Sequence, residues 1–201
     1  MKMQSKGIIL TAAMAGLMLP LAAQTSTPAT APATINQRKE NQQDRIANGI
    51  QSGELTAGET RNLEKKESEV NQEERDMRKL DNGHLTAADR ATLNQQQNTL
   101  SKDIYKDKHN SRVHNTDPKS EVGQRERNQQ ERIAQGVKSG QLTAGETAHL
   151  EGREAAINKE VHNDRAANGG KLTSAERRQV NRQEDRTSHA IYREKHNRRV
   201  Q

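Results

Sequence analysis

The sequence contains no cysteine, phenylalanine or tryptophan, and its only aromatic residues are Tyr105 and Tyr192. Without cysteine the chain has no disulfide, no thiolate metal site and no lipid-attachment cysteine. Hydrophobic residues make up 29% of the sequence and charged residues 30%. Because so few large apolar side chains are available for a core, we expect a marginally stable monomer, or a chain that relies on a partner or forms a homo-oligomer.

Long apolar runs are also missing, apart from one at the start of the chain. This run extends from Gly7 to Leu19, follows Lys2 and Lys6, and is followed by small residues up to Ala23. The pattern is typical of a secretory signal and is too short for a stable membrane anchor. We therefore predict a signal peptide over residues 1–23, no transmembrane anchor after its cleavage, and a periplasmic or secreted mature protein. Residues 24–34, rich in Ser, Thr, Pro and Ala, are predicted to be a flexible spacer.

The rest of the chain is a tandem duplication. The segment NQQDRIANGIQSGELTAGETRNLE begins at Asn41 and returns as NQQERIAQGVKSGQLTAGETAHLE at Asn128, 87 positions later. The same offset relates Tyr105 to Tyr192. This self-similarity predicts one repeat unit over 35–110, a second over 122–201, and a linker over 111–121 that contains Pro118.

A shorter pattern, Gly-x-Leu-Thr followed by an acid three residues after the threonine, occurs twice in each repeat. A glycine ends a helix by adopting the left-handed conformation, and a threonine with an acid three residues later forms a capping box for the next helix. Each pattern therefore predicts a helix, a tight turn and another helix. The patterns begin at Gly53, Gly83, Gly140 and Gly170, with threonines Thr56, Thr86, Thr143 and Thr173 and acids Glu59, Asp89, Glu146 and Glu176.

These turns divide each repeat into three predicted helices with apolar residues at steps of three, four and seven. The fold class is therefore all-α, with two tandem three-helix units that resemble a helical bundle. In the second unit Asp164 and Thr187 replace Met77 and Leu100, so we expect that unit to pack less well. The predicted helices span 37–52, 57–81, 87–109, 124–139, 144–168 and 174–196.

The turn resembles the loop of an EF-hand in its glycine, in its apolar residue two positions later and in its closing acid. This resemblance implies calcium binding through Glu59, Asp89, Glu146 and Glu176. None of the four loops has a carboxylate at the first, third or fifth position, where the family holds the ion. A divalent-metal binder is therefore the alternative function, and a capped turn without metal is favoured. The repeated turn is also similar to that of exported bacterial proteins of no assigned activity.

A second candidate site closes each repeat, in the segments IYKDKHN and IYREKHN. On a helix, a tyrosine and a histidine four positions apart share one face, with two cations beside them. A phenol, an imidazole and two cations suit a phosphate or a sugar carboxylate. The alternative is a plain helix end, where cations favour the last turn and the tyrosine packs inward. The residues are Tyr105, Lys106, Lys108 and His109, and Tyr192, Arg193, Lys195 and His196.

Catalytic motifs are missing from the sequence. It has no His-x-x-x-His pair, no nucleophile elbow and no glycine-rich phosphate loop, so we predict neither an enzyme nor a cofactor. Its glutamates are expected to be ordinary surface groups. The net charge of +6 is compatible with an anionic partner, but without aromatic stacking platforms no specific nucleic acid is expected. The sequence favours an exported structural or interaction module that binds an anionic envelope polymer or a partner protein.

Overall fold

The computed structural model describes residues 33–113 and 119–199, which contain six α-helices and no strand. The all-α prediction is confirmed, and each predicted helix lies within a few residues of the observed one. The predicted signal peptide, nearly all of the predicted spacer and the centre of the predicted linker lie outside the described residues. The helices are α1 (Ile35–Ser52), α2 (Ala57–Leu80), α3 (Ala87–Lys108), α4 (Glu121–Lys138), α5 (Ala144–Ala167) and α6 (Ser174–Lys195).

The helix ends follow from the repeated turn. The four predicted glycines have φ between 70° and 89°, the left-handed conformation that other residues adopt only with strain. At each of the four turns the threonine hydroxyl accepts from the backbone N–H three residues on, and the acid side chain accepts from the threonine N–H. All four predicted capping boxes are present. Thr34 forms a fifth with Gln37 at the start of α1.

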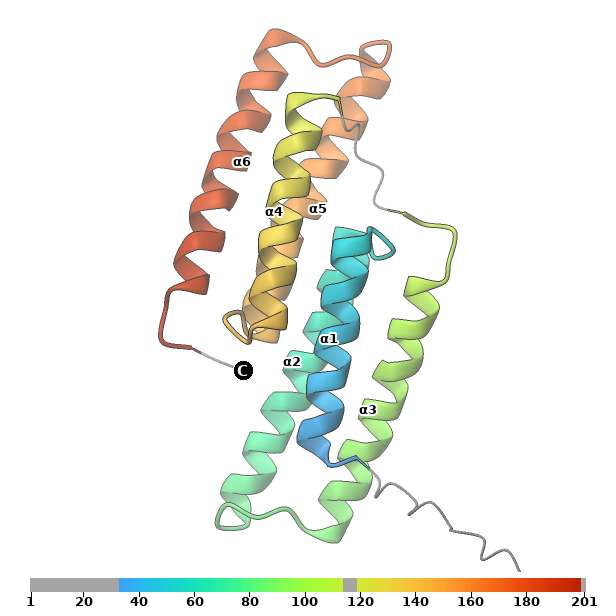
Figure 1. The fold of residues 1–201 in the computed structure, drawn as a ribbon, viewed down its shortest axis with the longest axis vertical. Coiled ribbons are helices and arrows are strands. Elements are labelled where there is room, and N and C mark those ends of the chain that lie inside the picture. Colours follow the sequence, from blue (N-terminus) through green and yellow to red (C-terminus); the bar gives the residue numbers. More distant parts are fainter. Residues whose placement is uncertain (1–32, 114–118, 200–201) are drawn as a thin grey trace, which may run out of the picture. The chain divides into compact units, whose positions relative to one another are not determined.

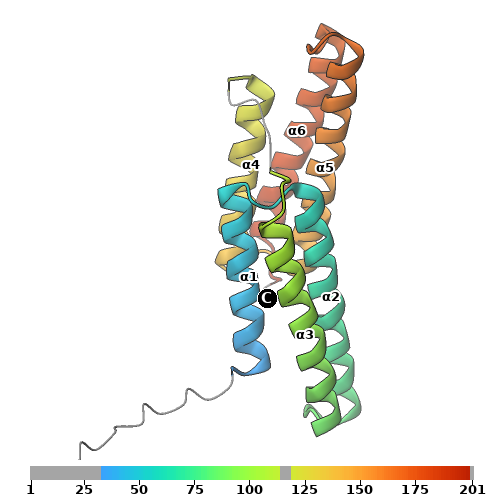
Figure 2. The ribbon, with the colours of Figure 1, turned by 90° about the vertical axis from the view of Figure 1, so that its right-hand side faces the viewer.

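The helices pack as equivalent pairs from the two repeats. Helix α1 contacts its counterpart α4, and α2 makes its most extensive contact with its counterpart α5. Within each pair the two helices run in opposite directions (Figures 1 and 2). Helix α3 packs on α1 and α2, and α6 packs on α4 and α5. Each repeat therefore turns the same two helices toward the other repeat, and Ala33–Gln201 forms one compact unit.

A single hydrophobic cluster joins the two repeats. Its residues come in equal number from each repeat, and most are related by the duplication: Ile46, Ala47, Ile50, Leu55, Leu63, Leu100, Ile104, Ile133, Ala134, Val137, Leu142, Leu150, Ala190 and Ile191. The few large apolar side chains of each repeat are therefore buried together with those of the other repeat. A smaller cluster of Val122, Ile157, Val161 and Val180 lies within the second repeat. Among the described residues, no helix is long and apolar enough to cross a membrane.

Candidate functional site

The acids of the four turns serve the helix N-termini. Glu59 Oε2 lies 3.0 Å from the backbone N and 2.7 Å from the hydroxyl of Thr56. Asp89 and Glu176 each accept the equivalent backbone bond at 2.8 Å, and Glu146 does so at 3.0 Å. The carboxylates proposed as metal ligands in the EF-hand alternative are thus engaged in capping boxes. Among the described residues, no group of three or more His, Asp or Glu is placed to hold a metal ion.

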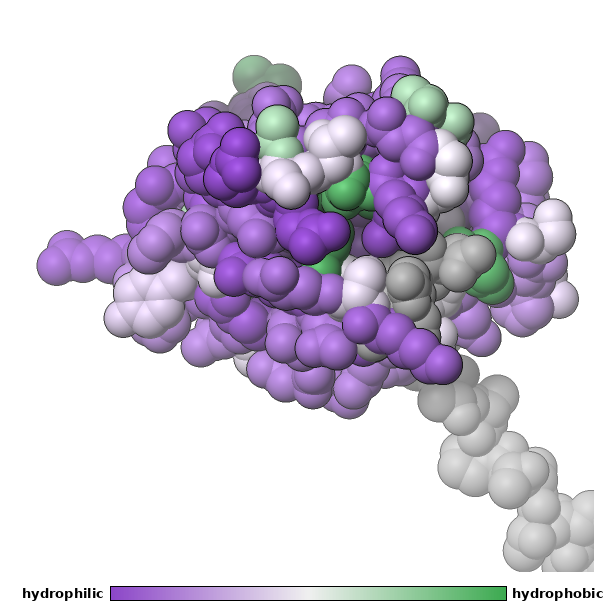
Figure 3. Space-filling view, turned by 90° about the horizontal axis from the view of Figure 1, so that it is seen from above, coloured by the Kyte–Doolittle hydropathy of each residue, from purple (hydrophilic) through white to green (hydrophobic). Residues whose placement is uncertain are grey.

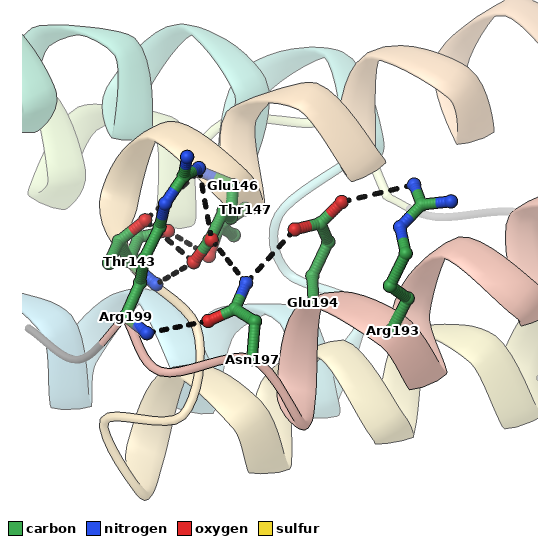
Figure 4. A network of polar contacts seen from close by, with 7 residues as sticks. All are labelled: Thr143, Glu146, Thr147, Arg193, Glu194, Asn197 and Arg199. Carbon is green, nitrogen blue, oxygen red and sulfur yellow. Dashed lines mark hydrogen bonds and ion pairs between the residues drawn. The ribbon is translucent and has the colours of Figure 1, made fainter.

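Two of these acids, Glu59 and Glu146, also bind residues at the end of their own repeat. We call these two sets of contacts the capping junctions. In the second, Asn197 Nδ2 donates to Glu146 Oε1 at 2.8 Å and Arg199 lies 3.7 Å from the same oxygen (Figure 4). In the first, Asn110 and Arg112 make the same contacts with Glu59, at 2.8 and 3.6 Å. The structure therefore brings together two segments that the sequence analysis treated as separate sites.

Electrostatics at the capping junctions favour the ionised acid. Burial by itself would raise the pKa of Glu59, but hydrogen bonds from Thr56 and Asn110 outweigh it and lower the pKa. The same balance lowers the pKa of Glu146, with Thr143 and Asn197 as the donors. Each carboxylate already accepts several donors, so a calcium ion would have to displace a helix cap.

The tyrosine and histidine of each closing segment form a stacked pair. The rings of Tyr105 and His109 have centroids 4.1 Å apart and planes 22° apart, and those of Tyr192 and His196 are 4.1 Å and 26° apart. In both pairs the histidine Nδ1 lies 2.7 Å from the tyrosine carbonyl oxygen, so it donates to the last turn of the helix. The tyrosines are 60% and 61% exposed, so they do not pack inward as the alternative reading expected.

The four predicted cations divide into two kinds. Lys108 and Lys195 lie inside the helix packing: Lys108 Nζ is 3.2 Å from Glu54, and Lys195 Nζ donates to the carbonyl of Arg132 at 3.2 Å. Burial lowers the pKa of Lys195. Lys106 and Arg193 are exposed, with Arg193 3.2 Å from Glu194. We call the exposed sets Tyr105, Lys106 and His109, and Tyr192, Arg193 and His196, the Tyr–His patches.

The structure also reveals buried carboxyl groups at positions where the sequence predicts surface residues. Glu64 and Glu67 on α2, with their equivalents Glu151 and Glu154 on α5, are at most 1% exposed. Gln43 donates to Glu64 at 3.1 Å, and Gln130 donates to Glu151 at 3.0 Å. Glu64 of α2 and Glu151 of α5 act on each other electrostatically, so the most extensive contact between the repeats includes acids as well as apolar groups.

Burial shifts these groups toward the neutral acid. It raises the pKa of Glu64 well above its ordinary value; the hydrogen bond from Gln43 opposes the shift, and Glu67 and Glu151 add to it. Burial likewise raises the pKa of Glu67 to about 7, against the attraction of Lys39 and with the repulsion of Glu74. Acids with perturbed pKa values are thus present although the chain has few large apolar side chains, which corrects the expectation that the glutamates are ordinary surface groups.

Internal repetition was the one sequence signal for these acids. Glu64 and Glu67 stand unchanged at 151 and 154, while neighbouring exposed positions such as Lys65 and Lys66 become Gly152 and Arg153. Glu67 also lies seven residues after Thr60, which is buried, so it continues the inward stripe of α2.

Comparison of the chain with protein-family models, curated proteins and solved structures returns no match.

Proposed function

We propose that the protein is an exported helical interaction module, without catalytic activity, that binds an anionic envelope polymer or partner protein at its two Tyr–His patches. The observation that carries this proposal is the exposure of both tyrosines, at equivalent positions, in a chain with no other aromatic residue. Burying either ring would have added apolar area to a core that has little. Both rings instead face the solvent.

The chemistry of each patch suits a ring-bearing or phosphate-bearing anion. A tyrosine ring stacked on a histidine offers a fixed aromatic face, and the adjacent cation, Lys106 or Arg193, attracts a carboxylate or phosphate. The face of the molecule seen in Figure 3 is largely hydrophilic. Two equivalent patches on one chain favour a repeating polymer, because the second contact forms at a high effective concentration.

Export is the part of the proposal that rests on the first residues of the chain. A signal peptide over residues 1–23 would deliver the mature chain to the periplasm or the medium. Mass spectrometry of the protein isolated from the envelope fraction tests it: a mature N-terminus near residue 24 supports export, and an intact Met1 in the cytoplasmic fraction contradicts it.

Tyrosine fluorescence tests the binding proposal directly, because the chain has no tryptophan and both tyrosines lie in the patches. We expect a saturable change on titration with polygalacturonate or polyphosphate, none with neutral dextran, and a weaker response at higher salt. The double variant Lys106→Ala, Arg193→Ala should bind at least tenfold more weakly.

A charge-matched control removes two cations elsewhere. Lys65 and Lys79 have side chains that are 73% and 72% exposed and lie outside the patches. The variant Lys65→Ala, Lys79→Ala should bind like the wild type, apart from a small effect of net charge. Equal losses in the two double variants would mean that general charge attracts the polymer, and the patches would then not be the site.

A further inference from the structure

The two repeats differ at two of three equivalent positions that lie on neighbouring helices. The first repeat has Lys39, Glu67 and Gln97, and the second has Glu126, Glu154 and Glu184. The glutamate at position 67 is kept at 154, while the cation and the amide of the first repeat are replaced by acids in the second. We call Glu126, Glu154 and Glu184 the second-repeat acid cluster.

Each member of the second-repeat acid cluster comes from a different helix of the same repeat. Glu126 lies on α4, Glu154 on α5 and Glu184 on α6, and these three helices pack on one another. Glu126 is 4% exposed, and Glu154 and Glu184 are fully buried. Neither carboxylate oxygen of Glu154 has a hydrogen-bond partner among the described residues. An ionised group in such a place would lose its hydration without compensation.

The charges that face Glu154 are mostly of its own sign. Glu126 approaches it from α4, Glu184 from α6, and Glu151 lies one turn earlier on α5. The equivalent Glu67 in the first repeat is attracted by Lys39 of α1 and repelled by Glu74 of α2. The same buried acid therefore faces a cation in one repeat and further acids in the other.

The charges around Glu184 partly compensate one another. Gln129 of α4 donates a short hydrogen bond to its carboxylate. Arg125 of α4 attracts the carboxylate, while Glu126 of α4 and Asp185 of α6 repel it. Arg125 also lies 2.6 Å from Asp185. Within the part of the chain that the structure describes, the attraction of Arg125 for Glu184 is thus shared with Asp185.

We propose that the second-repeat acid cluster is a proton-binding site that holds α4, α5 and α6 together, so that the second repeat loosens before the first as the medium changes from acidic to neutral. Protons taken up from solvent neutralise the carboxyls of Glu154 and Glu184, which the packing has already desolvated. At neutral pH these protons leave, and the carboxylates repel one another and favour solvent. The first repeat, with Lys39 and Gln97 at two of the three positions, has less repulsion to release.

The pKa shifts of Glu154 and Glu184 agree with a site that binds protons. Burial raises the pKa of Glu154 well above its ordinary value, with Glu184, Glu151 and Glu126 adding to the rise. Burial also raises the pKa of Glu184, to about 7, from 4.5. A raised pKa in the folded state stabilises the fold at low pH, and this stabilisation is lost as the pH rises from the unfolded value through the folded one. The affected window therefore runs from about pH 5 to 8.

The duplication supplies the decisive variant. The double variant Glu126→Lys, Glu184→Gln gives the second repeat the residues that the first repeat has at these two positions. The full-length mature chains of the wild type and the variant are unfolded with urea at several pH values between about pH 5 and pH 8. In the wild type we expect the folding equilibrium constant to fall about tenfold per pH unit for each proton released. In the variant, the fall of the folding equilibrium constant per pH unit should be smaller by a factor of about ten, which corresponds to one proton fewer released. The control Glu131→Lys with Glu69→Gln makes the same charge change at exposed positions and should keep the wild-type dependence.

Hydrogen exchange locates the effect. Protection of α6 should fall more than that of its counterpart α3 between pH 5 and pH 8, after correction for the intrinsic exchange rate, and the difference should disappear in the variant. If the double variant does not fold, Glu184→Gln alone removes one carboxyl at nearly constant volume and should give a smaller change of the same sign. An unchanged pH dependence in the variant that folds, or equal loss of protection in α3 and α6, overturns the proposal.

Discussion

Carboxyl groups in this protein have two kinds of surroundings, which shift their pKa in opposite directions. Glu59 and Glu146 accept several hydrogen bonds at helix N-termini, which lowers their pKa. Glu64 and Glu67 are buried in the helix packing, and burial raises their pKa. The caps lose their stabilising effect as the pH falls below about 4.5, and the buried acids lose theirs as the pH rises above it. The free energy of unfolding should therefore be greatest at mildly acidic pH.

Glu64→Gln tests this at a single residue. Folding at pH 7.5 requires Glu64 to take up a proton or to bury its charge, and the amide removes that cost. Urea unfolding should show a stabilisation of about 2 kcal/mol at pH 7.5 and almost none at pH 4.5. The matched change Glu69→Gln, at a side chain that is 64% exposed, should stay within about 0.5 kcal/mol at both values. A loss of stability in Glu64→Gln at pH 7.5 would show that the folded state holds an ionised, well-paired carboxylate.

Glu59→Ala tests the structural role of a turn acid against a metal-binding role. The change removes the acid of the α2 capping box together with the contacts to Asn110 and Arg112, and should cost about 2 kcal/mol. Glu176→Ala removes an exposed cap and should cost about 1 kcal/mol or less. Millimolar calcium, with magnesium as control, should not change the thermal melt of the wild type followed by circular dichroism. A calcium-dependent rise of many degrees that Glu59→Ala abolishes would favour the EF-hand alternative.

The helices could be predicted from sequence because their ends are defined by local chemistry. Glycine, threonine and acid in fixed order determine where one helix ends and the next begins, and these interactions span only a few residues. Helix pairing was not predictable in the same way. The contacts of α1 with α4 and of α2 with α5 join residues about 87 positions apart. Because the burial of Glu64 depends on such distant contacts, the sequence alone predicts a surface group at this position.

The candidate sites show the same division between local and distant contacts. The stacking of Tyr105 on His109 follows from their spacing of four residues on a helix. The burial of Lys108 depends on α1 and the turn that follows it: its stem packs beside Gly49 of α1, and its ammonium reaches Glu54 of the turn. The sequence therefore predicted the members of the patch but not which cation remains exposed.

Helix α1 and the turn that follows it meet so closely that one position requires glycine. A Cβ added at Gly49 would lie 2.7 Å from two atoms of the fully buried Leu55. Gly49→Ala should therefore destabilise the fold by about 1–3 kcal/mol, although alanine favours helices. At Gly58, in the first turn of α2, an added Cβ meets nothing within 4 Å, so Gly58→Ala should stabilise by about 0.5–1 kcal/mol. Equal effects of the two changes in urea unfolding would contradict this packing of α1.

At the scale of the whole molecule, duplication compensates for a poor composition. Each repeat has few large apolar side chains, and the equivalent faces of the two repeats bury them together in one cluster. The second repeat was expected to pack less well, yet it has a further cluster around Val180, while Thr187 is buried where the first repeat has Leu100. Its divergence is clearest in polar residues, at Glu126 and Glu184. The repeats therefore share a framework and differ in the charges that they bury.

The association of the two repeats can be measured by cutting the chain between them. A protease site is inserted between Val113 and Lys119, the full-length mature protein is cleaved after folding, and the mass of the product is measured in solution under native conditions. If α1 and α2 bury their apolar faces against α4 and α5, the two halves remain together as a one-to-one complex with unchanged helical content. Separation into two folded monomers would contradict the shared core.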